Sequence, residues 1–230
     1  MSSIFNKNYV EVTYSDTKTE YPRLLAEHIF KDIKNKKILD IGCGNGEISK
    51  NLKDLGNDVY GVDASESAKK HLGDNFFKVD LQNDMYPFED NTFDVVFSKS
   101  VIEHLQDPDH MLKEAYRVLK KGGVVITMTP SWKHSYRYQF YIDHTHVTPF
   151  IRYSLGTIHK LEGFEDIECE YFYQLPIVWK YPLVKMLCKI VTLLKLPYPP
   201  FENGIFKNER INKFLRFSQE VMLLCKAVKK

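Results

Sequence analysis

The amino-acid sequence predicts an α/β fold in which helices cover both faces of a mostly parallel sheet. Three observations between residues 36 and 130 predict it. Short apolar runs alternate with segments of helical spacing, three glycines follow the first run, and an acid ends the next run. Strands that alternate with helices form parallel sheets with right-handed connections, and ligands bind beyond the carboxyl ends of the strands.

The first apolar run, residues 38–41, has the composition of a strand buried on both faces. Gly42, Gly44 and Gly46 follow it, and the next apolar residues recur at helical spacing. Glycine allows a sharp turn and the close approach of a ligand, and the helix behind the turn presents backbone N–H groups at its start. This segment is therefore predicted to form a strand, a tight turn and a helix.

Asp63 ends a second run, residues 58–62, about 20 residues after Gly42. At that spacing a carboxylate on the neighbouring strand reaches the hydroxyls of a bound ribose. The third glycine arrives one residue earlier than in the dinucleotide-binding pattern, and no Gly-Lys-Ser/Thr follows it. Neither a dinucleotide loop nor a phosphate-cradling loop is therefore expected.

The remaining elements follow in chain order. Pro22 is suited to the first turn of a helix over residues 24–29, Ser65 caps a short helix, and Asp107 starts a helix whose apolar stripe ends at Gly122. Further strands are expected at residues 76–79, 93–97, 124–128, 164–173 and 221–228. Further helices are expected at residues 153–161, 184–196 and 212–219.

Composition and charge limit the class of protein. The chain has 230 residues, 43% of them hydrophobic, which suits one domain with a full core. Its net charge is +2 without a long basic run, so no nucleic-acid partner is expected. The four cysteines lack metal-ligand spacing, and neither a signal peptide nor a membrane-spanning run is found, so a cytoplasmic protein is expected.

The stretch from Asp40 to Gly46, Asp-Ile-Gly-Cys-Gly-Asn-Gly, resembles the first motif of the class I S-adenosylmethionine-dependent methyltransferases. Later motifs continue the resemblance in order: Val59–Asp63, Lys78–Leu81, Phe93–Phe97 and Arg117–Gly123. The resemblance implies S-adenosyl-L-methionine as the cofactor. It also implies a Rossmann-like sheet of seven strands in the order 3-2-1-4-5-7-6, with the last strand antiparallel and a helical insertion before it.

A single domain is expected, with the divisions that the resemblance implies. These are an N-terminal arm and helix (1–34), a cofactor-binding core (36–130), an acceptor-side loop, helix and strand (131–173), a helical lid (174–219) and the last strand (220–230). The helix over residues 184–196 carries a narrow stripe of lysines, which a membrane-surface helix or a dimer interface would also show. Packing as a lid is the first expectation.

The resemblance also implies which residues contact the cofactor. The glycine turn lines its methionine portion, Asp63 holds the ribose, and Asp80 and Leu81 hold the adenine. The full expected set is Asp40, Gly42, Cys43, Gly44, Asp63, Ala64, Asp80, Leu81 and Ser98. Arg23 is either a partner of the methionine carboxylate or a solvated surface residue, and the second is favoured.

Residues 143–146, Asp-His-Thr-His, are the first candidates for catalysis because they follow the fifth strand, where the family binds its acceptor. A histidine accepts a proton at neutral pH, so His144 and His146 are candidate general bases. On an extended chain both rings would lie on one side, which also suits a metal held with Asp143. A histidine that bonds to the backbone and shapes the loop is the alternative.

Glu103 and His104 resemble a Glu-His pair of the ubiquinone-type O-methyltransferases. Some of those enzymes bind Mg²⁺ with a further acid three residues earlier, and Ser100 stands at that position here. No metal is therefore predicted. His104 is either a catalytic residue or a structural support that faces the cofactor.

Aromatic residues after the fifth strand are candidates for an acceptor pocket, although they are equally suited to the core. The expected pocket holds Tyr136, Tyr141 and Asp143, with Trp132, Tyr138 and Trp179 as further ring candidates.

The predicted activity is methyl transfer to a small polar metabolite, above all O-methylation of a sugar, sugar nucleotide or glycan precursor, with a quinone-like phenol as another fit. The alternatives are an RNA or protein methyltransferase, an N-methyltransferase acting on a small amine, and a non-catalytic cofactor-binding module. Stable membrane insertion is not expected, and a homodimer is left open.

Overall fold

The computed structural model describes residues 20–136, 140–194 and 209–230. Its centre is a seven-stranded sheet in the order β3-β2-β1-β4-β5-β7-β6, as predicted. Strands β1 to β5 are parallel, and β7 runs antiparallel between β5 and β6. The strands are β1 (Lys37–Ile41), β2 (Asp58–Asp63), β3 (Phe76–Lys78), β4 (Phe93–Lys99), β5 (Leu119–Pro130), β6 (Glu165–Tyr173) and β7 (Val221–Val228).

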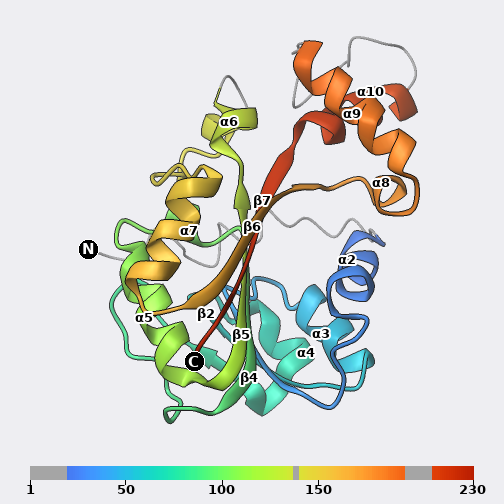
Figure 1. Cartoon of the computed structure of the whole chain (residues 1–230). Helices are drawn as coiled ribbons and strands as arrows, with labels where there is room; N and C mark the ends of the chain where they lie inside the picture. The colour runs from blue at the N-terminus through green and yellow to red at the C-terminus, as the bar shows by residue number, and fades with distance from the viewer. Residues whose placement is uncertain (1–19, 137–139, 195–208) are drawn as a thin grey trace.

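Helices cover both faces of this sheet (Figure 1). One face is covered by α2 (Tyr21–Phe30), α3 (Glu47–Asp54) and α4 (Lys69–Leu72), the other by α5 (Pro108–Val118) and α7 (Arg152–Leu161). The remaining helices are α6 (Trp132–Ser135), α8 (Pro176–Lys180), α9 (Pro182–Leu194) and α10 (Glu209–Gln219). Single 3₁₀ turns are η1 (Glu66–Ala68), η2 (Gly73–Asn75), η3 (Ile102–His104) and η4 (Phe140–Ile142).

Each face of the sheet has its own apolar core. Leu25 and Phe30 of α2 pack with Leu52 of α3 against one face. On the other face, Leu112 of α5 and Leu155 of α7 belong to a second buried cluster. Strands with apolar side chains on both faces are what a central parallel sheet requires, which explains why their sequences are almost continuously hydrophobic.

The carboxyl ends of the parallel strands form one edge of the sheet. In Figure 1 this edge lies at the top, where β5 runs into α6, and the C-terminus lies at the opposite end. The lobe of α8, α9 and α10 stands beyond the same edge, above α2. Residues 131–136 and 140–150, together with helices α8, α9 and α10, therefore flank the edge at which parallel sheets bind their ligands.

The predicted end of α5 was wrong. The apolar spacing continues through Leu119, which predicted a helix up to Gly122, but the helix ends at Val118 and Leu119 is already the first residue of β5. Asp107 caps the start of this helix as expected, with its side chain accepting from the backbone N–H of His110. Leu119 is buried in β5, and its apolar side chain would fit the inner face of a helix equally well.

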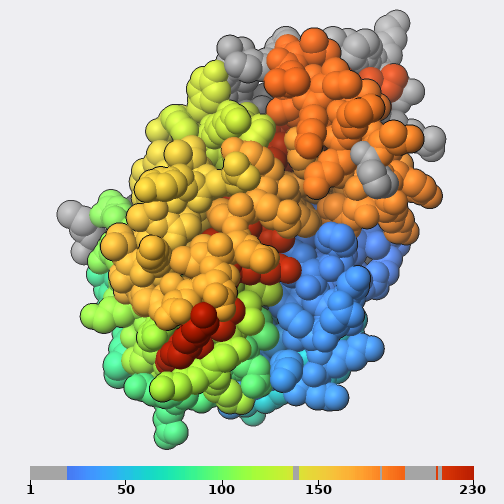
Figure 2. Space-filling model, viewed as in Figure 1, coloured from blue at the N-terminus to red at the C-terminus, as the bar shows by residue number. Residues whose placement is uncertain are grey.

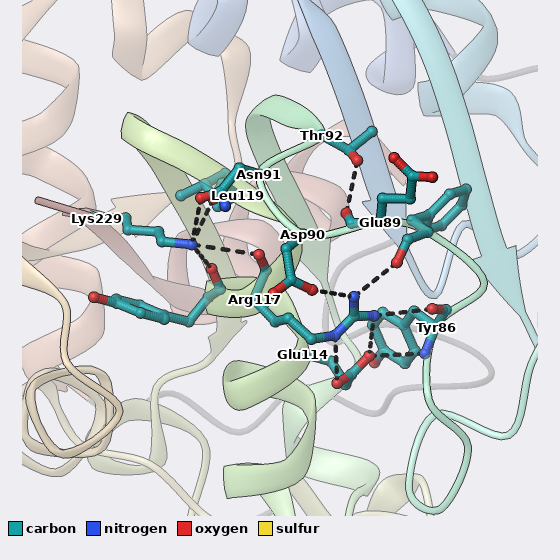
Figure 3. Close-up of polar contacts among 11 residues, drawn as sticks. Tyr86, Glu89, Asp90, Asn91, Thr92, Glu114, Arg117, Leu119 and Lys229 are labelled. Carbon is teal, nitrogen blue, oxygen red and sulfur yellow. Dashed lines mark hydrogen bonds and ion pairs between the residues drawn. The ribbon is translucent and has the colours of Figure 1, made fainter.

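Lys229, just after β7, joins the C-terminus to the end of α5 (Figure 3). Its Nζ donates to the carbonyls of Tyr116 at 2.7 Å and Leu119 at 2.8 Å, and to Oδ1 of Asn91 at 3.0 Å. The last carbonyls of a helix have no partner within the helix, and a cation stabilises that end. In the same region Arg117 bonds Glu114, which is buried, and the carbonyl of Tyr86.

We expect Lys229→Met to lower the free energy of unfolding by about 1–3 kcal/mol, because it leaves buried carbonyls without a donor. Urea unfolding followed by circular dichroism measures this change. Lys226→Met, at an exposed position of β7, is the matched control and should change stability by less than about 0.5 kcal/mol. Equal losses in the two variants would contradict this role of Lys229.

Candidate active site

The turn after β1 has the left-handed backbone that its glycines predicted. Gly42, Gly44 and Gly46 have φ angles of +70°, +55° and +79°, which residues with a side chain rarely adopt. A Cβ on Gly42 would also overlap the side chain of Val101. The turn is therefore packed directly against the segment that follows β4.

Asp63 ties this turn to the end of β2. Its Oδ2 accepts from the backbone N–H of Gly44, and its Oδ1 accepts from that of Ser65, both at 2.8 Å. Burial raises the pKa of Asp63, and these backbone bonds partly offset that rise. Each carboxylate oxygen can accept a second hydrogen bond, so the side chain can hold the turn and still receive ligand hydroxyls.

Asp40 and Cys43 lie behind the turn and are buried. Asp40 accepts from the hydroxyl of Ser49 on α3 at 2.5 Å. Burial raises the pKa of Asp40 to about 7 and that of the Cys43 thiol well above its usual value. A cationic ligand above the turn would favour the ionised form of Asp40.

The other cofactor candidates lie at neighbouring strand ends. Asp80 follows β3, and its two oxygens accept from the backbone N–H of Gln82 and the side-chain amide of Asn83, both at 3.1 Å. Leu81 is half-buried beside it, Ala64 follows Asp63, and Ser98 is buried near the end of β4. The structure thus brings the expected set to one edge of the sheet, and their contact with a cofactor stays a prediction.

The 3₁₀ turn η3 carries Glu103 and His104 just beyond β4, and both are buried. Residues 145–148 lie across it, because the backbone N–H groups of Val147 and Thr148 both donate to the carbonyl of Glu103. The Thr148 hydroxyl adds a bond of 2.7 Å to the carbonyl of Leu105. These bonds join two segments that lie about forty residues apart in the sequence and fix the loop that carries His146.

His104 belongs to a chain of hydrogen bonds. Its Nδ1 lies 2.8 Å from the hydroxyl of Thr145, and that hydroxyl donates to Oδ1 of Asp143 at 2.6 Å. Because the hydroxyl proton goes to Asp143, Thr145 accepts from Nδ1–H, and Nε2 of the neutral ring carries the lone pair. Burial above all, and then the neighbouring His146, lowers the pKa of His104 to about 4.

His146 has the same tautomer for a separate reason. Its Nδ1 lies 2.6 Å from the carbonyl oxygen of Phe140, which can only accept, so Nδ1 carries the proton and Nε2 the lone pair. Burial lowers the pKa of this ring, which is therefore neutral near pH 7. The rings of His104 and His146 lie 4.5 Å apart between centroids.

Glu103 completes the group. Its Oε2 accepts from the hydroxyl of Thr129 on β5 at 2.9 Å, and its Oε1 is buried without a hydrogen-bond partner among the described residues. Burial raises its pKa to about 7. Glu103, His104 and His146 offer ligand atoms that lie within 4.8 Å of one another.

This cluster of Glu103, His104 and His146 is rich in acceptors at neutral pH. Two neutral imidazoles, and Glu103 in its ionised form, can receive a proton from a hydroxyl. They can also hold a divalent cation, for which this set suits Zn²⁺, Mn²⁺ or Fe²⁺ better than Mg²⁺. The prediction of no metal started from Ser100 after β4 and did not include His146. It stays a prediction.

Known proteins resemble this chain both in sequence and in fold. The family described as methyltransferase domain matches residues 39–127. A ubiquinone biosynthesis O-methyltransferase of Pelagibacter ubique is 36% identical over 122 residues, which cover 46% of this chain and 51% of that protein. Residues 39–127 are therefore identified as a methyltransferase domain, similar to those of the class I S-adenosylmethionine-dependent enzymes. The chain spans about half the length of the curated relatives that it matches.

Solved structures support the methyltransferase fold. A methyltransferase of Haloferax volcanii, in complex with the activator Trm112, has a TM-score of 0.68 at 17% identity and covers 96% of this chain and 94% of its own. A SAM-dependent methyltransferase of Archaeoglobus fulgidus has a TM-score of 0.60 at 22% identity, with 90% and 94% covered. At these identities the likeness shows the fold alone.

Of the three histidines expected to act in catalysis, His104 and His146 lie together and His144 does not. The interpretation of residues 143–146 as extended was wrong, because they form a turn that buries Thr145 and leaves His144 exposed. Only His146 joins Glu103 and His104 in the cluster. A two-residue spacing predicts one shared side only where the backbone is extended.

The predicted pocket residues lie at different depths. Tyr136 and Tyr141 are 42% and 61% exposed, and Asp143 is half-buried in the chain that reaches His104. Trp132 and Tyr141 belong to a ring cluster that continues through Phe140 to His146. Tyr138 lies outside the described residues. Trp179 stacks on His28 of α2 at 4.5 Å between centroids, where it anchors α8.

Sequence reasoning missed Lys99, the last residue of β4. Its side chain is half-buried, its Nζ lies 3.4 Å from the hydroxyl of Ser100 and 6.0 Å from the ring centre of Tyr21, and burial lowers its pKa. A lysine that ends a buried strand at the carboxyl edge was the available signal. Arg23, by contrast, is exposed and pairs with Glu27 at 2.6 Å, as the surface interpretation expected.

Proposed function

We propose that this chain transfers the methyl group of S-adenosyl-L-methionine to a hydroxyl of a small polar metabolite. A sugar, sugar nucleotide or glycan precursor is the first acceptor class, and a phenol is the second. The observation that carries the proposal is the cluster of Glu103, His104 and His146, fixed beside the glycine turn by the contact between Gly42 and Val101. Proton acceptors beside the segment that we propose to bind the methyl donor support this assignment.

The cofactor is assigned to the carboxyl edge. The turn at Gly42–Gly46 faces its methionine portion, Asp63 accepts from its ribose hydroxyls, and Asp80 with Leu81 faces its adenine. The hydrogen-bond geometry of Asp63 supports this assignment, because its carboxylate is held in place by two backbone N–H groups. A preorganised acceptor loses little entropy when the ribose binds.

Methyl transfer is an in-line displacement at carbon. A lone pair of the acceptor oxygen forms the new C–O bond, the C–S bond breaks with its electrons left on sulfur, and the sulfonium becomes a neutral thioether. The acceptor proton passes to Nε2 of His146 or His104. Positioning and proton removal are then the two tasks of the protein.

The ring cluster from Trp132 to His146 supports a small acceptor that lies against aromatic faces. Exposed Tyr141 extends this cluster to the surface. The net charge of +2 gives little support to an RNA substrate. Nitrogen methylation, a macromolecular acceptor and a non-catalytic binding module remain separate outcomes of the test below.

Lys99 is assigned to the methionyl carboxylate of the cofactor. No carboxylate of the described residues lies within ion-pair distance of its Nζ, although the fields of Glu103 and Glu220 reach it. A half-buried ammonium is stabilised by an anionic partner. Strand β4 lies beside β1, whose glycine turn is expected to line the methionine portion. Arg23 already has carboxylate partners on its own helix.

We expect Lys99→Met to weaken the binding of S-adenosyl-L-homocysteine about tenfold or more, because one charge-assisted bond is worth roughly 1.5–3 kcal/mol. Isothermal titration calorimetry measures the dissociation constant. Arg23→Met is the matched control and should bind as the wild type does. Unchanged affinity in Lys99→Met, or a loss in Arg23→Met as large as that in Lys99→Met, would contradict the assignment.

The acceptor is found by incubating the purified protein and S-adenosyl-L-methionine carrying an isotope-labelled methyl group with fractionated metabolites, then locating the label by mass spectrometry. We expect a labelled methyl ether on a small hydroxylated compound. Label on nitrogen, RNA or protein would move the proposal to those alternatives, and cofactor binding without any transfer would indicate a binding module.

We expect His146→Ala or His104→Ala, whichever removes the general base, to lower kcat about 100-fold or more, because a general base contributes roughly 10²–10⁴-fold. His144→Ala, with its exposed ring in the same turn, is the matched control and should retain turnover. Wild-type assays after treatment with a chelator test the cation alternative. If chelation abolishes the activity and only a divalent cation restores it, a metal-assisted mechanism replaces direct proton transfer to histidine.

A further inference from the structure

The outer face of α9 is apolar and exposed to solvent. Six large hydrophobic side chains form it: Leu183, Met186, Leu187, Ile190, Leu193 and Leu194. All except Leu187 and Ile190 are at least 58% exposed. Ile177 and Tyr181 of the neighbouring α8 segment are also about half exposed. Scattered apolar side chains are ordinary on a surface, but a contiguous group on one helix indicates a site of interaction.

The opposite face of α9 holds the helix onto the protein. Cys188 and Val191 are buried, and the hydroxyl of Thr192 donates to the carbonyl of Ser218 on α10 at 2.9 Å. At about 100° per residue, most of the exposed set points away from this packed face, and Leu187 lies at its border. The outer face is therefore not needed for the packing of α9 on the described part of the chain.

The charged side chains of α8 and α9 all have the same sign. Lys185 and Lys189 are exposed on the helix between the packed and the outer faces, and Lys180 ends α8. Residues 174–194 contain these three lysines and no acidic residue. An apolar helical face bordered by lysines is complementary to a surface with apolar depth and anionic groups.

We propose that the outer face of α9 docks on the surface of an anionic lipid bilayer. The apolar side chains enter the boundary between headgroups and acyl chains, and the lysines lie against lipid phosphates. With 13 residues, α9 is about 20 Å long, shorter than the hydrocarbon core. Within the described part of the chain, no helix has the length and hydropathy needed to span a membrane. The helix therefore lies along the surface.

A second copy of this chain fits the face less well. A symmetric contact through α9 brings the same patch of both copies together, and so places the Lys185 and Lys189 rows near each other. Like charges at such a contact oppose association, whereas lipid phosphates neutralise them. Charge thus favours the bilayer over self-association.

Docking through α9 would also orient the molecule. In Figure 2 the orange α8–α9 segment forms the upper right lobe of the face in view, at the same end as the carboxyl edge in Figure 1. Trp179, stacked on His28 of α2, ties this lobe to the core. The end of the protein that carries the proposed active site would therefore lie on the membrane side.

The test uses the full chain with sedimented vesicles of phosphatidylcholine, with and without 30 mol% phosphatidylglycerol (roughly the anionic content that gives a strong surface potential). We expect binding to the anionic vesicles, weakened by salt. The double variant Leu187→Ser/Ile190→Ser should bind about tenfold less, and so should Lys185→Glu/Lys189→Glu. Lys69→Glu/Lys70→Glu, at exposed positions of α4, matches the second variant in charge and should bind as the wild type does.

Circular dichroism and cofactor titration of each variant show whether the fold is kept, independently of the vesicle result and of any methyl transfer. Three results would overturn the proposal: no vesicle binding by the wild type, undiminished binding by Leu187→Ser/Ile190→Ser, or equal losses in the two charge-reversed variants. A wild-type dimer that becomes monomeric in Leu187→Ser/Ile190→Ser, without vesicle binding, would assign the face to a second copy.

Discussion

The hydrogen bond from the Gly44 N–H to Asp63 is the constraint on which this edge of the molecule depends. It closes the turn after β1 onto the end of β2, and the second oxygen of the same carboxylate holds Ser65 at the next turn. Burying that carboxylate is costly, and the two backbone donors offset part of the cost. A single acid thus fixes the strand ends and leaves acceptor capacity for a ribose.

The position of the proposed proton acceptors follows from the same turn. Gly42 leaves room for Val101, Val101 leads into the 3₁₀ turn of Glu103 and His104, and the carbonyl of Glu103 holds the loop that brings in His146. The proposed proton acceptors and the proposed cofactor turn are therefore connected by direct packing and backbone hydrogen bonds. The α8–α10 lobe packs on α2 and on the ends of β6 and β7, and the outer face of α9 points to solvent.

Much of the fold could be predicted from the sequence because the spacing of apolar residues distinguishes strands from helices, and capping residues, glycines and prolines mark many of their ends. Asp107 and the glycine turn mark boundaries locally, whereas Leu119 satisfies both periods and gave the wrong end for α5. The candidate site was only partly predictable. His146 enters the cluster because its loop is held by backbone hydrogen bonds to residues about forty positions away. The spacing of the two histidines gives no indication of the turn that exposes His144. Lys99 was missed because the hydrophobic pattern identifies strand β4 but does not show where the ammonium group at the end of that strand lies.

A crystal structure of the protein with S-adenosyl-L-homocysteine tests the central claim most directly. We expect the ribose hydroxyls on the carboxylate of Asp63, the homocysteine portion over Gly42–Gly46, and the thioether sulfur directed toward the cluster of Glu103, His104 and His146. A ribose bound away from Asp63, or a sulfur that points away from this cluster, would contradict the account.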